Sequence, residues 1–214
     1  MSVLVFDTET TGLPDYKKAV NDPVQPYIVQ LAAILTDDNG ETVSEMNVII
    51  KPDGWSVPTG TAAVHGIPTE RAEQYGVPIM SALHLFKLMY DKADYLVAHN
   101  IDFDLRMLRR YFPNDDECPF LQGMVTKYDT KLAMTNITQL PLTEKQQAAQ
   151  AKFPNWTPPG GWPKFKDPTM GEAFFHFFGE ELDGAHSAMV DTEACKDVFF
   201  ELKKLGLPLE GVYK

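Results

Sequence analysis

Apolar segments rich in β-branched residues alternate along this chain with segments of helical periodicity. This alternation is typical of an α/β domain whose largely buried sheet is covered by helices. The predicted strands are residues 3–6, 28–36, 43–51 and 95–98, with a short fifth strand ending near residue 130. Because the turn Asp37-Asp38-Asn39-Gly40 separates the second strand from the third, this pair is expected to form an antiparallel hairpin.

The spacing of apolar residues predicts helices around residues 83–90, 105–112, 172–178 and 189–205. Thr169-Met170-Gly171-Glu172 has the pattern of a capping box that opens the third helix, and Gly179 suits its C-terminal stop. Gly206 is expected to close the last helix.

The length of 214 residues favours a single domain over residues 1–214. Hydrophobic residues make up 44% of the chain and charged residues 23%, which argues against a disordered chain. The regular patterns lapse between about residues 138 and 168, in a stretch that becomes rich in Pro and Trp. Since helices that complete the core follow it, this stretch is expected to be an excursion from the domain and not a boundary.

No apolar run approaches the ~18 residues needed to cross a bilayer, and Met1-Ser2 leads directly into the first predicted strand. We therefore expect neither a membrane span nor a signal peptide. Cys118 and Cys195 show no metal-binding spacing and cannot form a disulfide framework. A reducing compartment, the cytoplasm, is expected, with Cys195 as a small core residue of a helix.

The charge balance is acidic, since 19 Lys+Arg against 30 Asp+Glu give a net charge of -11. This excess disfavours tight nonspecific binding to long duplexes, which depends on basic surfaces. Metal-assisted phosphate chemistry stays open, because bound divalent cations reverse the charge that a phosphate meets. Acidity that serves only solubility is the alternative, and composition by itself favours it.

The most specific local feature is Phe6-Asp7-Thr8-Glu9-Thr10-Thr11-Gly12, where two acids follow an apolar strand. Side chains alternate across a strand, so Asp7 and Glu9 are expected on one face, within reach of a common cation. Acid pairs are frequent in surface loops. The position after a buried strand makes this pair a candidate site, because buried carboxylates require a compensating partner.

A second acidic group follows the fourth predicted strand in Ala98-His99-Asn100-Ile101-Asp102-Phe103-Asp104. Two interpretations remain open for its acids. In the first, Asp102 caps the helix that follows and Asp104 stabilises the positive N-terminal end of that helix. In the second, Asp104 points inward and holds a metal.

A third group places His186 five residues before Asp191, at the start of the last predicted helix. An unperturbed imidazole, with a pKa near ~6.5, can accept a proton from water at neutral pH. The remaining histidines favour structural roles: His84 and His176 as helix residues and His99 as a strand-end residue.

The three groups together, Asp-x-Glu, His-Asn-x-x-Phe-Asp and His-x-Ala-x-x-Asp, resemble the DnaQ-like (DEDDh) family of 3′-to-5′ exonucleases. Residues 28–32, 64–67, 129–130 and 177–186 also resemble family segments, so the similarity covers nearly the whole chain in the right order. It implies a ribonuclease H-like α/β fold, with a five-stranded mixed sheet and helices on both faces.

The resemblance also implies roles for individual residues. Two Mg²⁺ or Mn²⁺ ions would be held by Asp7, Glu9, Asp104 and Asp191. His186 would act as general base. The terminal nucleotide would meet main-chain groups near Thr10 and Thr11 and a pocket lined by His65, Asn100 and Phe103. His65 equally suits a structural place in the turn before Ile67-Pro68.

The implied activity is removal of 5′-mononucleotides from the 3′ end of single-stranded DNA, in proofreading or end trimming, with a DNA polymerase as a candidate partner. An exoribonuclease or short-oligonucleotide-degrading enzyme is the first alternative, because nothing in the motifs separates ribose from deoxyribose. A noncatalytic nucleic-acid-binding module is the second. The presence of all five motif residues argues against it.

Three features outside the motifs have two interpretations each. The first is the segment 13–27, which is interpreted as a surface loop near the site or as a simple elaboration of the fold. The second is a basic cluster that is expected either to steer a nucleic-acid backbone or to be solvated: Arg106, Arg109 and Arg110. The third is the segment 162–166, whose alternating aromatic and cationic side chains are expected either to stack a base and meet a phosphate or to pack under a loop.

Overall fold

The computed structural model describes residues 1–123, 125–153, 157–158 and 160–206. The strands are β1 (Val3–Thr10), β2 (Ile28–Thr36), β3 (Thr42–Ile49), β4 (Tyr95–Ala98) and β5 (Thr126–Asp129). The helices are α1 (Thr59–His65), α2 (Thr69–Tyr75), α3 (Ile79–Tyr90), α4 (Ile101–Arg109), α5 (Thr130–Thr138), α6 (Glu144–Lys152), α7 (Met170–Phe178) and α8 (Ala188–Lys204), with a short 3-10 helix at Asp115–Glu117.

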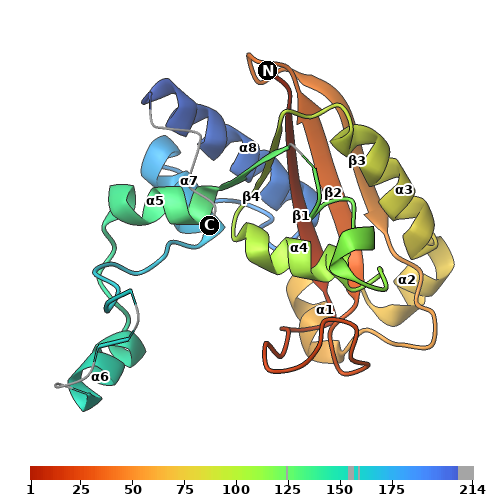
Figure 1. Ribbon diagram of the computed structural model, residues 1–214, viewed down its shortest axis with the longest axis horizontal. Coiled ribbons are helices and arrows are strands. Elements are labelled where there is room, and N and C mark those ends of the chain that lie inside the picture. Colours follow the sequence, from red (N-terminus) through yellow and green to blue (C-terminus); the bar gives the residue numbers. More distant parts are fainter. Residues whose placement is uncertain (124, 154–156, 159, 207–214) are drawn as a thin grey trace.

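The strands form one mixed sheet in the order β3-β2-β1-β4-β5, with β1 at its centre (Figure 1). β2 runs antiparallel to β1 and β3, which confirms the predicted hairpin, whereas β4 is parallel to β1 and β5. β1 is longer than its apolar residues predict. Asp7 and Glu9 remain paired with Ala32 and Gln30 of β2, so both acids lie inside the strand and not after it.

Helices cover both faces of the sheet, as predicted. Leu4 and Phe6 of β1 face one way, into a cluster with residues of α3 and α4. Val3 and Val5 face the other way, into a cluster with residues of α7 and α8 that also contains the buried Cys195. Because successive residues of β1 alternate between these clusters, β1 carries side chains toward α4 and toward α8 in turn.

The helix ends are partly as predicted. The Thr169–Glu172 capping box opens α7 and Gly179 ends it. α4 begins earlier than predicted and stops before Phe112, and the residue at its N-cap position is Asn100. Asp102 therefore does not cap this helix. The N–H groups of Asn100 and Ile101 instead donate to the carboxylate of Asp129, from the end of β5.

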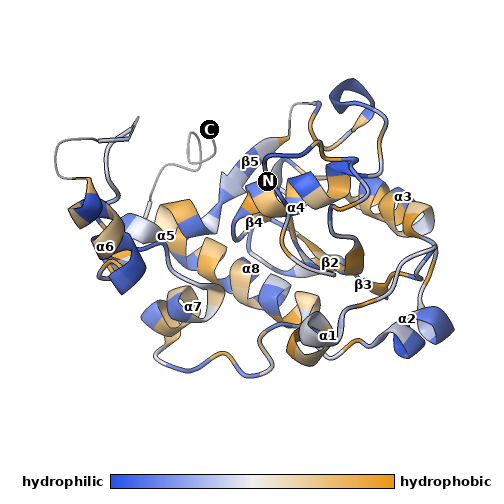
Figure 2. Cartoon of the chain, turned by 90° about the horizontal axis from the view of Figure 1, so that it is seen from below, coloured by the Kyte–Doolittle hydropathy of each residue, from blue (hydrophilic) through white to orange (hydrophobic). Residues whose placement is uncertain are grey.

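Helix α6 projects away from the rest of the protein in both views (Figures 1 and 2). It lies within the stretch at 138–168 that the sequence sets apart, and none of its residues is buried. The two legs of this excursion meet where the N–H of Lys166 donates to the carbonyl of Leu140. Residues 154–156 and 159 of the Pro- and Trp-rich part lie outside the described residues.

Among the described residues, no helix is both long enough and apolar enough to cross a bilayer.

Candidate active site

Three acids meet at the C-terminal end of β1. Asp7 and Glu9 project from the face of β1 that α8 covers, and Asp191 lies in the first turn of α8. One carboxylate oxygen from each of the three lies within 4.8 Å of the others. The structure thus brings together acids that lie more than 180 residues apart in the sequence.

Asp104 approaches the same end of β1 from the opposite face. It belongs to α4 and is only 2% exposed. Its Oδ1 accepts hydrogen bonds from the backbone N–H (3.1 Å) and the hydroxyl (2.6 Å) of Thr8, the residue between the two acids of β1. Of the two interpretations of this acid, the inward one therefore describes its position. Within the described part of the chain, no donor is bonded to its Oδ2.

The pKa of each of these four carboxyl groups lies above its ordinary value, and burial is the main cause. The pKa of Glu9 is raised to about 7 by burial and by the charge of Asp191. The pKa of Asp104 is raised to about 8 by burial, against the hydrogen bonds from Thr8. Burial and the charges of the neighbouring acids raise the pKa of Asp7, and burial raises that of Asp191.

The chain compensates these four carboxylates only in part, through the bonds from Thr8 to Asp104 and from His186 to Asp191. The donor set consists of carboxylate oxygens, which hard divalent cations prefer. The residues therefore fit a divalent metal site: bound cations would offset the desolvation and the mutual repulsion that raise the pKa values.

His186 is held beside the acids by its own backbone. Its N–H donates to Oδ2 of Asp191 at 2.8 Å, and its φ of 69° lies in the left-handed region. A left-handed conformation costs a residue with a side chain on the order of 1–2 kcal/mol, which the contact with Asp191 helps to offset. The side chain of His186 is exposed and lines the same cleft as the acids.

Gln30 fixes the position of α8, a role that the sequence analysis missed. It is buried in β2, where its Oε1 accepts from the N–H of Ala188 at 3.2 Å and its Nε2 donates to Asn47 at 2.7 Å. The available signal was an amide within an otherwise apolar buried strand, because such a group requires a specific partner.

A cleft of about 600 Å³ opens at the four-acid end of β1. Among the predicted substrate-binding residues, those that line it are Thr10, His65, Asn100 and Phe103. Thr11 is not among the described residues that line the cleft. Its N–H donates to the carbonyl of Tyr27, and its hydroxyl accepts from the N–H of Tyr27.

The histidines of the cleft differ in their surroundings. His65 ends α1, and its Nδ1 accepts from the N–H of Ile67, so it takes part in the turn and also lines the cleft. Burial lowers its pKa, and among the described residues its Nε2 has no partner. The ring nitrogens of His99 lie 3.0 Å from the Thr130 hydroxyl and 2.9 Å from the Pro168 carbonyl. This matches the predicted structural role of His99.

The arginines of α4 are not simply solvated, and the steering of a nucleic-acid backbone by them stays a prediction. Arg106 donates to the carbonyls of Asp15 and Lys18, Arg110 donates to the carbonyl of Asp22, and Arg109 forms an ion pair with Asp115. Arg106 also lies over the ring of Tyr16, and Arg110 over that of Tyr27. Arg106 and Arg110 thus fasten the 13–27 loop to α4. The sequence offered no sign of these contacts, because their acceptors are backbone carbonyls.

Residues of the 162–166 segment also make contacts within the protein. Lys166 forms an ion pair with Glu172, the residue that completes the α7 capping box. Lys164 lies 4.9 Å from the ring centre of its neighbour Phe165.

Comparisons with known proteins agree with this geometry. The RNase T family model, described as exonuclease, matches residues 4–154. The DNA polymerase III subunit epsilon-like protein of Rhodobacter capsulatus is 34% identical over 110 residues, which are 51% of this chain and 14% of that protein.

Solved structures of Escherichia coli exonuclease I share the fold. The complex with a dA16 oligonucleotide is 21% identical, with a TM-score of 0.63 over 95% of this chain. A zinc-bound complex with single-stranded DNA is 19% identical, with a TM-score of 0.66 over 97%. This chain spans 41% of each of those two chains. Because the family model covers most of the sequence and the fold agrees, this chain belongs to the exonuclease family, in the DnaQ-like group with a ribonuclease H-like fold.

Proposed function

We propose that this chain is a metal-dependent 3′-to-5′ exonuclease that releases 5′-mononucleotides from the 3′ end of single-stranded DNA. The observation that carries the proposal is the meeting of Asp7, Glu9 and Asp191, with Asp104 behind them, at the side of a cleft of about 600 Å³. That volume is in the range of small-molecule sites. The oligonucleotide complexes of exonuclease I support single-stranded DNA as substrate, and the 3′-to-5′ direction follows from the motif resemblance.

In this proposal the four acids hold two Mg²⁺ or Mn²⁺ ions. Such ions, when bound, stabilise the charge that develops on the phosphate and activate the attacking water. The chain contributes oxygen ligands on three different elements, so the ligands are fixed by the packing of α4 and α8 on the sheet. The contact between Thr8 and Asp104 orients one of them.

His186 accepts the proton of the attacking water. Its backbone bond to Asp191 ties the position of the imidazole to that of an acid, and its exposed ring can pass the proton on to solvent. The terminal nucleotide would lie along Thr10 and Thr11, between His65, Asn100 and Phe103. Thr11 takes part through its bonds to Tyr27, which fix the strand end beside the cleft.

The test is hydrolysis of single-stranded DNA and RNA of one sequence, each with a free 3′-hydroxyl, in the presence of Mg²⁺. We expect release of 5′-mononucleotides from DNA, none from an oligomer blocked at its 3′ end, and loss of release in Asp7→Ala and His186→Ala. Faster release from RNA would favour the exoribonuclease alternative. Binding without release in Mg²⁺ or Mn²⁺ would favour the noncatalytic module.

We also infer a DNA polymerase as protein partner and the cytoplasm as compartment. The name of the Rhodobacter relative supports the partner, and two free, buried cysteines suit a reducing compartment. Gel filtration of the chain with the replicative polymerase of its own cell tests the partner. Separate elution at micromolar concentrations would remove it from the proposal.

A further inference from the structure

We propose that Lys131 binds a backbone phosphate of the nucleic-acid strand, on the 5′ side of the phosphate that faces the four acids. This inference rests on the proposed function and adds a substrate contact that the sequence motifs do not contain.

Lys131 is the one lysine or arginine among the described residues that line the cleft. It is half-buried, and its Nζ lies 2.5 Å from Oδ1 of Asn100. Within the described part of the chain, no carboxylate forms an ion pair with it. Its charge is therefore available to a ligand.

The position of Lys131 is unfavourable for the helix that carries it. Lys131 is the second residue of α5, where the positive end of the helix dipole disfavours a cation. A residue that conflicts with its local structure often serves a site. Here that site is the cleft, toward which the side chain extends.

Lys131 is also held in place from two sides. Asp129 accepts from the N–H of Lys131 and from the N–H of Asn100, so a single buried carboxylate fixes the backbones of both residues. The Lys131 side chain is held in turn by its bond to Asn100, and a side chain that is already fixed binds a ligand with a smaller loss of conformational entropy.

Because the cleft is negatively charged, a nucleic-acid strand that enters it needs a cation to bind its phosphates. Glu9, Asp7 and Asp191 line the cleft and repel phosphates that are not in contact with metal ions. An ammonium group has three N–H donors, and the bond to Asn100 uses one, which leaves two for phosphate oxygens. Because Lys131 pairs with none of the four acids, it suits a phosphate next to the scissile one.

The test compares Lys131→Met with Lys131→Arg and with Lys92→Met. Lys92 is an exposed lysine at the opposite end of the sheet, so its substitution is a control for the change in net charge. We expect Lys131→Met to raise KM for single-stranded DNA about tenfold with kcat unchanged, since a charged hydrogen bond made equally in ground and transition states is lost. The slope of log KM against log salt should fall by about 0.7. Lys131→Arg should largely restore both values.

Methylphosphonate linkages locate the contact. A neutral linkage at the second or third phosphate from the 3′ end should weaken binding by the unmutated protein, measured by fluorescence anisotropy, and should have little further effect on Lys131→Met. Additive effects at both linkages, or an unchanged salt slope in Lys131→Met, would overturn the inference. If the unmutated protein binds DNA with this dependence on Lys131 but releases no nucleotide, the proposed function fails and the phosphate contact stands.

Discussion

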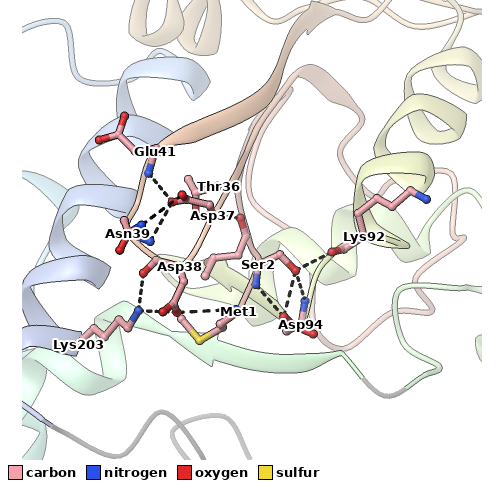
Figure 3. A network of polar contacts seen from close by, with 11 residues as sticks. Met1, Ser2, Thr36, Asp37, Asp38, Asn39, Glu41, Lys92, Asp94 and Lys203 are labelled. Carbon is pink, nitrogen blue, oxygen red and sulfur yellow. Dashed lines mark hydrogen bonds and ion pairs between the residues drawn. The ribbon is translucent and has the colours of Figure 1, made fainter.

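Carboxyl groups near the two ends of β1 have pKa values that are shifted in opposite directions. At the end near Met1, the pKa values of Asp37, Asp38 and Asp94 lie below their ordinary values. Figure 3 shows why: each of these acids is surrounded by donors. Asp37 accepts from backbone N–H groups of its own turn, Asp38 from Lys203, and Asp94 from the N–H and hydroxyl of Ser2.

At the other end of the same strand, burial and mutual repulsion raise the pKa values of Asp7, Glu9, Asp104 and Asp191. Both groups of acids lie at an end of one central strand, and they differ first in burial and second in the supply of donors. The first end is completed by the chain itself and contributes to stability. The second leaves buried carboxyl groups with raised pKa values beside a cleft, and perturbed groups in such a place are typical of functional sites.

The largest contrast between the two ends is expected from neutral, nearly isosteric substitutions. Asp7→Asn should lower the rate of hydrolysis by about 10³-fold, or ~4 kcal/mol of transition-state stabilisation, because a metal ligand is lost. Without metal it should raise the melting temperature at pH 8, because it removes a repelling charge. Asp94→Asn should leave the rate unchanged and lower the melting temperature. Single-turnover rates and thermal unfolding measure both, and an Asp7→Asn rate within threefold of the unmutated rate would contradict the assignment.

The second largest effect is expected in the pH dependence of the free energy of unfolding, to which the two groups of acids contribute in opposite directions. Burial raises the pKa of Glu9 from 4.5 to about 7, so the folded state binds this proton more tightly than the unfolded state does. The resulting stabilisation is complete below about pH 4.5 and is lost as pH rises through 7, by on the order of 3 kcal/mol for Glu9. Asp104, with a pKa of about 8, extends the loss to higher pH.

Urea unfolding in EDTA between pH 5 and 8.5 tests this trend, and added Mg²⁺ should flatten it. The acids near Met1 act in the opposite direction, since stability from a lowered pKa is lost as pH falls. Their effect should appear only below about pH 4, so a stability that rises between pH 5 and 8 without metal would refute the proposed charge state.

The next effect concerns the base. His186→Asn should lower kcat/KM by on the order of 10²-fold, because the proton acceptor is removed. His176→Asn, on the exposed side of α7, is the matched control and should preserve the rate. A kcat/KM in His186→Asn that equals that of His176→Asn would exclude His186 as the base.

The sequence predicted the fold well where periodicity is strong. The buried strands and the 37–40 hairpin were predictable because apolar runs and turn residues are local signals. Asp7 and Glu9 were predictable on one face, since alternation along a strand follows from backbone geometry. The capping role that the sequence left open for Asp102 was wrong: aspartate suits a cap, but the N–H groups at the start of α4 donate to Asp129 at the end of β5.

The rest depends on contacts between distant segments. No local pattern shows that Thr8 binds Asp104 across 96 residues, or that Gln30 holds the start of α8 across 158 residues. The contacts of the α4 arginines were unpredictable for a related reason. A basic cluster in a sequence looks free until its acceptors are seen, and here two of the three donate to backbone carbonyls of the 13–27 loop.

The smallest expected effect isolates the hydrogen bond behind the acids. Thr8→Val removes the hydroxyl that donates to Asp104 and keeps the volume and the backbone N–H. Without this donor the pKa of Asp104 should rise further, and loss of a supporting partner typically weakens metal binding. We expect the Mg²⁺ concentration for half-maximal hydrolysis to rise about tenfold, with little change in kcat at saturating Mg²⁺.

Thr36→Val is the matched control. It makes the same change at a buried threonine near the Met1 end of β1, where the hydroxyl lies 3.5 Å from the carbonyl of Val3. An equal shift in both variants would mean that the effect is general packing, whereas a shift in Thr8→Val alone would place the metal requirement at the acidic end of β1.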